Sequence, residues 1–245
     1  RIRPQEIGIL ASLGIGTVAT FAPPAVAVIA TGSEIVEPGR PLEKGHIYDS
    51  NSYSLAAQAE KAGATVKIRR RVVDRPALIR RTIAEALDRC DMVLVSGGVS
   101  AGDLDFVPGI LRELGVDLKF EQIAVQPGKP TVFGTRRGRI VFGVPGNPVS
   151  TFVIFEVFIK PVLMRMMGLD EGPSVVRAAM EKDIMRRKTE RAAFVPVRVR
   201  AGAVIPLDYH GSAHIRALGR ADGLLYIPKG RSGYAAGSRV DVRLI

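Results

Sequence analysis

Short hydrophobic runs and amphipathic segments alternate through the first two thirds of the chain. The first three hydrophobic runs, which are typical of buried strands, are residues 26–30, 65–68 and 92–95. Between them, residues 51–62 and residues 76–87 place apolar side chains on one face at helical spacing. Gly63 follows the first helix as a stop signal, and Pro76 lies in the first turn of the second. This alternation, with right-handed crossovers, predicts an α/β fold, doubly wound around a mostly parallel sheet.

The pattern continues to Gly168 and then changes. It predicts a helix over residues 105–114, strands over 131–134 and 140–144, and a helix from about 149 to 167. After Gly168 the chain has short alternating runs broken by glycine and proline, which predict a small antiparallel β domain. We therefore assign residues 1–24 to a lead-in segment, residues 25–169 to the α/β domain and residues 170–245 to the β domain.

The composition is that of a soluble globular protein. Of the 245 residues, 47% are hydrophobic and 24% are charged. No apolar run approaches the roughly 18 residues that span a bilayer, and the first residues lack a secretion signal, so we expect a cytoplasmic protein. The single cysteine, Cys90, cannot form an internal disulfide, and we expect it in the core.

The net charge of +11 raises the question of a nucleic-acid partner. The densest group of basic residues, between Lys67 and Arg81, runs from a strand through a turn into a helix, and the chain has no tryptophan to act as a stacking platform. We therefore interpret the charge as a general attraction for anionic ligands. A nucleic-acid module remains an alternative that rests on charge alone.

Three loops follow the carboxyl ends of predicted strands, and in an open α/β sheet ligands bind at that edge. They comprise residues 31–34, residues 96–105 and residues 145–150. In the second loop, Gly97, Gly98 and Gly102 allow backbone N–H groups to approach an anion, and Ser96 and Ser100 add hydroxyl donors. A helix that begins near residue 105 would strengthen anion binding with its dipole. The same residues are also typical of a plain glycine turn in which Asp103 or Asp105 caps the helix.

Several polar residues around these loops are further candidates. Glu34 and Asp105 could hold Mg²⁺ beside bound phosphates, although Glu34 alone is equally typical of a solvated carboxylate. In the third loop, Pro145 and Pro148 stiffen the backbone around Gly146 and Asn147, and Ser150 follows at the helix start. An ordinary turn with Asn147 as helix cap explains that loop equally well.

Two more positions complete the candidates. Lys129 lies on a proline-flanked turn, where it could reach an oxyanion or simply be solvated. At the start of the helix over residues 51–62 we expect Ser50 or Asn51 to cap, which leaves Asp49 for ligand contact. His210 and His214 lack a third ligand, so a zinc site is not expected. No nucleophile elbow, Walker sequence or dinucleotide fingerprint follows any predicted strand.

Taken together, these motifs resemble one family, the molybdopterin molybdenumtransferases, which include bacterial MoeA and the E domain of gephyrin. The motifs that carry the resemblance occur in the family's order at residues 30–34, 45–51, 96–106, 126–130 and 143–150. The lead-in segment is similar too, and the resemblance weakens after residue 170. It implies that adenylylated molybdopterin and molybdate are converted to molybdenum cofactor with release of AMP, helped by Mg²⁺.

The resemblance also implies roles for the candidates. The residues implied to bind the pterin nucleotide are Thr31, Gly32, Asp49, Ser96, Gly97, Gly98, Ser100, Gly102, Asp103, Pro145, Gly146, Asn147 and Pro148. Glu34 and Asp105 would hold Mg²⁺ and act in catalysis together with Lys129. The residues implied to bind molybdate are Lys129, Ser150, Arg191 and Ser212.

The chain differs from the family in lacking its usual N-terminal half, which helps to build a homodimer and completes the site. The first residue, Arg1, is not a methionine, which favours a fragment. We expect such a fragment to bind pterin or nucleotide with little transfer activity. Two alternatives remain beside the nucleic-acid module: a molybdopterin adenylyltransferase, which shares the glycine loop but uses ATP, and a non-catalytic pterin-binding scaffold.

Overall fold

The first domain is built around a parallel sheet, as the sequence predicts. The computed structural model describes residues 2–99, 106–208, 211 and 213–245. In the described part of the first domain the strands run in the order β4 (Thr65–Val72), β1 (Ala25–Thr31), β5 (Met92–Ser96), β9 (Arg139–Val144), β8 (Val132–Arg136) and β6 (Asp117–Phe120). The first four strands are parallel, and β8 and β6 are antiparallel to their neighbours.

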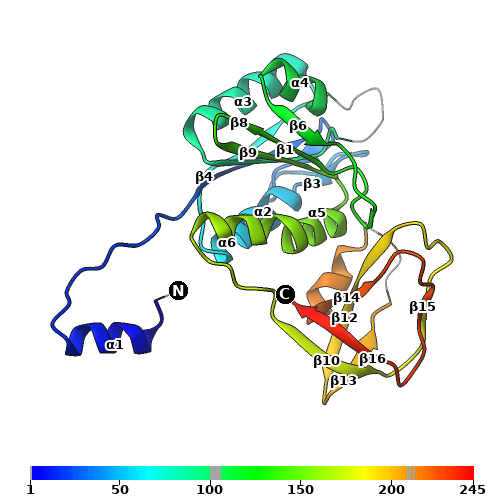
Figure 1. Ribbon diagram of the computed structural model, residues 1–245. Helices are drawn as coiled ribbons and strands as arrows, with labels where there is room; N and C mark the ends of the chain where they lie inside the picture. Colours follow the sequence, from blue (N-terminus) through cyan, green and yellow to red (C-terminus); the bar gives the residue numbers. More distant parts are fainter. Residues whose placement is uncertain (1, 100–105, 209–210, 212) are drawn as a thin grey trace.

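Helices cover both faces of this sheet (Figure 1). One face holds α2 (Asn51–Lys61), α5 (Pro148–Ile154) and α6 (Lys160–Met166), and the other holds α3 (Pro76–Arg89) and α4 (Val107–Glu113). Every residue of β1 is buried, because successive side chains point to opposite faces and both faces are covered. Val26 and Val28 join the core on the α2 face, whereas Ala27 and Ile29 join the core on the α3 face.

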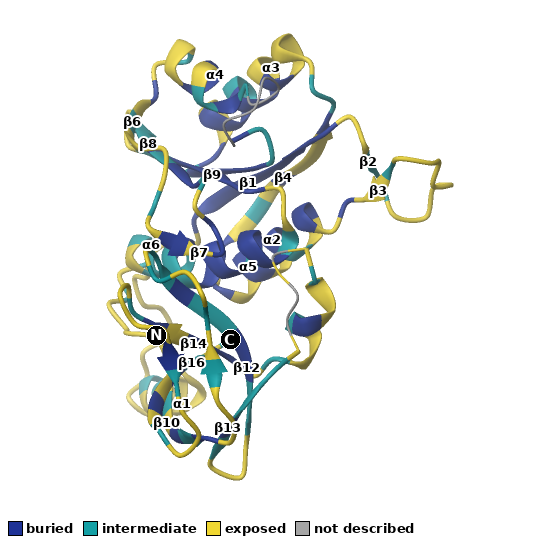
Figure 2. Cartoon of the chain, turned by 90° about the vertical axis from the view of Figure 1, so that its right-hand side faces the viewer, coloured by how far each residue is buried: buried dark blue, intermediate teal, exposed yellow. Residues whose placement is uncertain are grey.

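The second domain is an antiparallel β unit with its own core. The strands of its sheet run in the order β13 (Ala203–Pro206), β10 (Val175–Met180), β16 (Arg239–Leu244), β14 (Gly223–Ile227), β12 (Ala192–Arg200) and β7 (Val125–Gln126). Two short strands, β11 (Ile184–Met185) and β15 (Gly233–Tyr234), pair with each other, and η2 (Ile215–Arg220) is a 3₁₀ helix. Figure 2 shows buried residues concentrated in the middle of this sheet. Buried and exposed positions alternate along the first part of β16, whereas β14 has one exposed residue, Tyr226, and places Leu224 and Leu225 in two different cores.

The two domains meet through a buried polar cluster. Residues 155–159 form a π-helical turn, η1 (Phe155–Ile159), between α5 and α6. In this turn the carboxylate of Glu156, only 3% exposed, accepts a bond from Gln58 Nε2 at 3.0 Å and pairs with Lys160 Nζ at 2.8 Å. Its backbone carbonyl accepts a bond from Arg243, on β16. Burial lowers the pKa of the Arg243 guanidinium. Glu156 is therefore bonded both to Lys160, on helix α6 of the first domain, and to Arg243, on strand β16 of the second domain.

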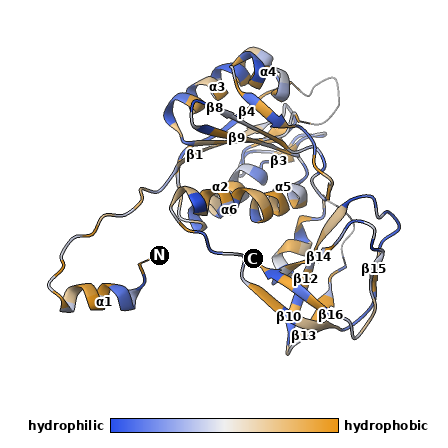
Figure 3. Ribbon diagram, viewed as in Figure 1, coloured by the Kyte–Doolittle hydropathy of each residue, from blue (hydrophilic) through white to orange (hydrophobic). Residues whose placement is uncertain are grey.

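Two segments project from the body of the molecule. The lead-in segment contains α1 (Pro4–Ser12), none of whose residues is buried, and Figure 3 shows apolar residues along it. The second segment is a two-stranded flap, residues 33–48, formed by the parallel strands β2 (Ile35–Val36) and β3 (Ile47–Tyr48) (Figure 2). The flap lies beside the carboxyl ends of the main sheet.

Several boundaries differ from the sequence-based predictions. Strand β4 extends four residues beyond the predicted strand over 65–68, because the arginines at 69–71 continue to pair with β1 at the sheet edge. The described part of α4 begins at Val107 rather than at residue 105, and the predicted helix over 149–167 is interrupted by η1. The first domain also contributes β7 to the second sheet, a pairing that only the tertiary fold creates.

Cys90 is fully buried, as predicted. Among the described residues, no helix combines the length and the apolar character that crossing a membrane requires.

Candidate functional site

A cavity of about 590 Å³ lies at the carboxyl ends of β1, β5 and β9. The sequence-predicted site residues that line it are Thr31, Gly32, Glu34, Asp49, Ser96, Gly97, Gly98, Gly146, Asn147 and Pro148. The chain runs from β1 to β4 on one side and then to β5 on the other, so the strand order reverses at β1. Ligands of open α/β sheets bind in the crevice at such a reversal. The structure thus brings residues from all three predicted loops to one pocket.

The glycine loop after β5 leaves room only for backbone. Gly97 has a φ of +92°, and a Cβ atom there would meet the carbonyl oxygen of Thr31 at 2.5 Å. Gly98 has a φ of +64°, and its Cβ would meet the Val107 side chain at 2.9 Å. Because side chains are excluded from both positions, the loop can present its backbone to a ligand at close range. The N–H of Gly97 itself donates to the Val144 carbonyl at 3.1 Å, and the anion-binding role of the loop stays a prediction.

Asn51 joins the loops of the pocket. Its side-chain nitrogen donates to Ser96 Oγ at 2.9 Å and to the carbonyl oxygen of Gly146 at 2.6 Å. Ser96 Oγ in turn donates to the carbonyl of Pro145 at 3.4 Å. Asn51 is 8% exposed, so these bonds form in a partly desolvated setting where they fix the loops against each other. We expected Asn51 only as a possible helix cap; this role was missed because its partners are 45 and 95 residues away.

Ser50 stands at the N-cap position of α2, as predicted, but Asp49 makes the side-chain bond that caps the helix. Asp49 accepts bonds from the backbone N–H of Ser52 at 2.9 Å and from the Ser52 hydroxyl. Ser50 makes no capping bond with its side chain, and Asn51 is directed to the loops. The Asp49 carboxylate is only 3% exposed yet lies in the wall of the pocket. Its helix cap therefore also fixes a carboxylate beside the ligand space.

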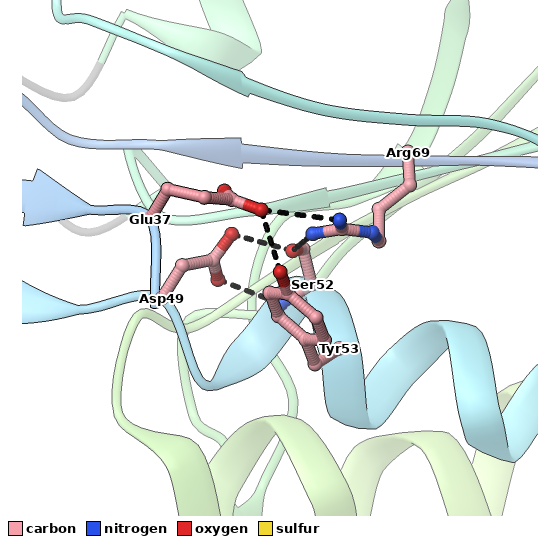
Figure 4. Close-up of polar contacts among 5 residues, drawn as sticks. All are labelled: Glu37, Asp49, Ser52, Tyr53 and Arg69. Atoms are coloured by element: carbon pink, nitrogen blue, oxygen red, sulfur yellow. Dashed lines mark hydrogen bonds and ion pairs between the residues drawn. The ribbon is translucent and has the colours of Figure 1, made fainter. Parts of the chain in front are cut away.

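A polar network lies behind this carboxylate (Figure 4). Arg69, on the edge strand β4, donates to Ser52 Oγ at 3.1 Å and to Glu37 Oε1 at 3.2 Å. Its guanidinium lies 3.8 Å from the ring centroid of Tyr53, whose hydroxyl also donates to Glu37. The Tyr53 hydrogen bond, followed by that of Arg69, holds the pKa of Glu37 below its usual range. The same bond to Glu37 raises the pKa of Tyr53.

Asp74 is a pocket residue that the sequence analysis missed. It accepts a bond from the backbone N–H of Ser33 at 2.9 Å, and its own N–H donates to Ser33 Oγ at 3.1 Å. Asp74 follows β4, so it lies at the same sheet edge as the three loops. Asp74 could be predicted from its position just after a strand. The sequence-based prediction ends this strand at residue 68, so Asp74 is not recognised as a residue of the sheet edge.

The pocket offers oxygen ligands for a hard cation. Glu34, Asp49 and Asp74 line it, and the carboxylates of Asp49 and Asp74 are occupied by internal bonds. The backbone carbonyl of Glu34 accepts from the Ile47 N–H at 2.9 Å, whereas its side chain makes no hydrogen bond or ion pair with the described residues. No cluster of three metal-ligating side chains occurs among the described residues.

Four predicted residues lie elsewhere. Pro145 and Ser150 do not line the pocket, and Ser150 is buried in α5 at 3% exposure. Lys129 is exposed, and Arg191 donates to the Val125 carbonyl at 3.5 Å. The pairing of β7 with β12 places their two segments side by side at the domain junction. Ser100, Gly102, Asp103, Asp105, His210 and Ser212 lie outside the described residues.

Comparisons with known proteins agree with this geometry. A family described as "Probable molybdopterin binding domain" matches residues 27–165, and one described as "MoeA C-terminal region (domain IV)" matches residues 177–245. Over 247 and 250 aligned residues, the chain is 34% identical to a molybdopterin molybdenumtransferase of Staphylococcus aureus and 33% identical to one of Bacillus subtilis. These alignments cover 99% and 100% of the chain but 59% and 58% of the relatives, so the chain spans about three fifths of their length.

A solved structure leads to the same family. The crystal structure of a molybdopterin biosynthesis MoeA protein from Pyrococcus horikoshii superposes with a TM-score of 0.86 at 32% sequence identity. The superposition covers 98% of this chain and 59% of that chain. The match thus includes both domains and their connection. The chain belongs to the molybdopterin-binding-domain family, in the MoeA arrangement in which that domain is followed by the MoeA C-terminal region.

Proposed function

We propose that this chain binds adenylylated molybdopterin in the pocket at the sheet edge and takes part in inserting molybdate, with release of AMP. The observation that carries the proposal is the set of bonds from Asn51 to Ser96 and Gly146, which hold the glycine loop and the third loop around one cavity. Gly97 and Gly98 line the same space without side chains, and the Gly97 N–H is bonded to the Val144 carbonyl at 3.1 Å. A phosphate group is the ligand that such a backbone surface suits.

The pocket also offers apolar surface for a flat ring. Ile35, Ile47 and Tyr48 of the flap line the cavity. The pocket therefore combines apolar side chains with carboxylates and polar loop residues. A pterin or adenine ring with a phosphate attached likewise combines an apolar face with a charged end.

We propose Mg²⁺ as the cation of the site, held by Glu34 and Asp105 together with phosphate oxygens. The free carboxylate of Glu34 at the pocket wall supports half of this pair, and carboxylate oxygens are ligands that Mg²⁺ prefers. When bound, the ion would neutralise charge on the phosphates. The protein's own residues would orient the ligand: Asn51 keeps the loops in place, and Asp49 presents a fixed carboxylate.

For molybdate we propose Lys129, Ser150, Arg191 and Ser212. The β7–β12 pairing supports this set, because it brings the segments of Lys129 and Arg191 together at the domain junction. Fixed cations and hydroxyl donors suit a tetrahedral dianion. The proposal extends to a cytoplasmic homodimer of the longer protein, in which the partner subunit completes the site.

The proposal is tested by giving the purified chain AMP, with and without Mg²⁺, and measuring binding by calorimetry. We expect Mg²⁺ to increase the affinity for AMP. In the Glu34→Gln variant we expect this Mg²⁺-dependent increase to be about tenfold smaller. Glu43→Gln is the matched control, because Glu43 lies on the flap outside the pocket lining. Absence of AMP binding would contradict the proposal.

A second assay separates transfer from adenylylation. The chain is given adenylylated molybdopterin and molybdate, and AMP release is measured; in parallel it is given molybdopterin and ATP. We expect little AMP release by these 245 residues alone, and release when the part of a relative that they do not span is supplied. Formation of adenylylated product from ATP would favour the adenylyltransferase alternative instead.

A further inference from the structure

Arg69 occupies an unusual place among the basic residues of the edge strand. Its neighbour Arg70 points to the α3 side and pairs with Glu85 at 2.7 Å. Arg69 instead reaches toward the start of α2, where Figure 4 shows it between Ser52, Tyr53 and Glu37. It contacts all three of these residues. A guanidinium can do this because its donors form a rigid planar fork that also stacks on aromatic rings.

The first branch of the network leads to the pocket. Ser52 is fully buried and its hydroxyl has one proton, which it donates to Asp49. Arg69 donates to the same hydroxyl oxygen at 3.1 Å. Because that oxygen accepts from Arg69, its proton is directed away from the guanidinium and toward the carboxylate. Arg69 thereby fixes the orientation of Asp49 without touching the pocket itself.

The second branch leads to the flap. Glu37 follows β2 and accepts bonds from both Arg69 and Tyr53. Two residues further along β4, Arg71 donates to the carbonyl of Ile35 at 2.6 Å. The apolar wall of the pocket, Ile35, Ile47 and Tyr48, is part of the same flap. The hydrogen bonds from the edge strand β4 therefore help to fix the position of the flap residues that line the pocket.

A purely stabilising ion pair would explain less of this arrangement. The Arg69 and Glu37 side chains are 33% and 41% exposed, and ion pairs so exposed contribute little to stability. The contacts are instead divided between the start of α2 and the flap, which both border one pocket. We propose that Arg69 is a positioning residue of the ligand site, acting through Ser52 on Asp49 and through Glu37 on the flap. The proposal rests on the proposed function of that pocket.

The test compares two adjacent arginines of the same strand. Arg69→Gln, Arg69→Lys and the control Arg70→Gln are assayed for AMP binding with Mg²⁺ by calorimetry, for thermal stability, and for hydrogen exchange over residues 33–48. For Arg69→Gln we expect about tenfold weaker binding and faster flap exchange, with a melting temperature close to that of Arg70→Gln. Arg69→Lys should recover part of the affinity, because an ammonium can keep one contact but not the whole fork. Arg70→Gln should bind as the unchanged protein does.

A double variant tests the path through Ser52. If Arg69 acts through this hydroxyl, Ser52→Ala combined with Arg69→Gln should lose less affinity than the sum of the two single losses. Equal affinity in Arg69→Gln and Arg70→Gln would overturn the proposal, and so would an affinity loss matched by a general loss of stability. Fully additive losses would overturn the Ser52 branch. If the unchanged protein fails to bind AMP, the proposed function fails and the site role with it, while flap exchange still shows separately whether Arg69 holds the flap.

Discussion

Helix α2 takes part in two polar clusters that differ in how their charges are satisfied. At its start, Asn51 lines an open pocket, and the bonds of Asn51 and of the buried Ser52 hold loops and a carboxylate around that space. Two turns later, Gln58 contributes to the closed cluster at the domain junction. There both carboxylate oxygens of Glu156 are used by Gln58 and Lys160. The first cluster surrounds a cavity, whereas the second fills the space between domains.

This difference separates binding from stability. A buried charge is tolerated when a partner and hydrogen bonds compensate it, and removing one member of such a group destabilises the fold. Groups that surround a cavity contact the ligand rather than the core. Changing them should therefore reduce ligand affinity with little effect on the free energy of unfolding. Substitutions in the two clusters should therefore have opposite readouts.

The largest effect is expected at the glycine loop. In Gly97→Ala the new methyl group would lie 2.5 Å from the Thr31 carbonyl oxygen, so the loop must move away from its ligand-binding position. We expect AMP affinity to fall about a hundredfold, or roughly 2.7 kcal/mol. Gly138→Ala is the control: Gly138 has a φ of +79° but nothing within 4 Å of a Cβ, so it reports only the conformational cost. Calorimetry on both variants measures the contrast, and equal affinities would contradict the role of the loop.

The next effect is on stability at the junction. Glu156→Ala leaves the Gln58 amide nitrogen with only its longer bond to the Phe152 carbonyl, at 3.4 Å, and removes the partner of Lys160, whose side chain is 27% exposed and can still reach water. We expect about 2 kcal/mol of destabilisation by denaturant unfolding, with AMP affinity unchanged. Glu85→Ala is the matched control, because the Glu85 carboxylate likewise accepts from two side chains, those of Arg70 and Arg89, but is 32% exposed. If Glu156→Ala lowered the AMP affinity without lowering the stability, the proposed difference between the two clusters would be wrong.

The elements that position the site could largely be predicted from sequence. Strands β1 and β5 are continuous apolar runs because helices cover them on both faces, and the glycine loop follows directly. Strand β4 was predicted too short because its last residues are arginines, which an edge strand can expose while its backbone pairs with β1. Hydrophobic periodicity indicates which residues are buried, so it does not detect an edge strand whose side chains are charged and exposed.

The contacts within the site could not be predicted in the same way. Asn51 bonds to Gly146, 95 residues away, and Arg69 reaches Ser52 from the edge of the sheet. These pairs depend on how the helices lie on the sheet, which no local pattern encodes. The sequence could name residues with suitable chemistry at one edge, but which of them would orient the others became visible only in three dimensions.

The smallest expected effect is a pH dependence confined to the pocket cluster. The hydrogen bond from Tyr53, then that from Arg69, lowers the pKa of Glu37, so the stabilisation it provides is present above its ordinary value near 4.3 and is lost as pH falls through the lowered pKa. The bond to Glu37 raises the pKa of Tyr53, so its contribution is present below the ordinary value near 10 and is lost as pH rises through the raised pKa. The Glu37–Tyr53 contact should therefore persist from about pH 5 to about pH 10.

The alkaline limit can be measured by the ultraviolet absorbance of tyrosinate. Subtracting the titration of Tyr53→Phe from that of the unchanged protein isolates Tyr53, and its midpoint should lie above 10. In a Glu37→Gln background the midpoint should move down, because the neutral amide no longer opposes ionisation of the phenol. If the Tyr53 titration midpoint lay at the ordinary value both with Glu37 and in the Glu37→Gln background, the hydrogen bond between Tyr53 and Glu37 would be contradicted. The junction cluster contains no tyrosine among its bonded side chains, so the Glu156→Ala variant should leave this curve unchanged.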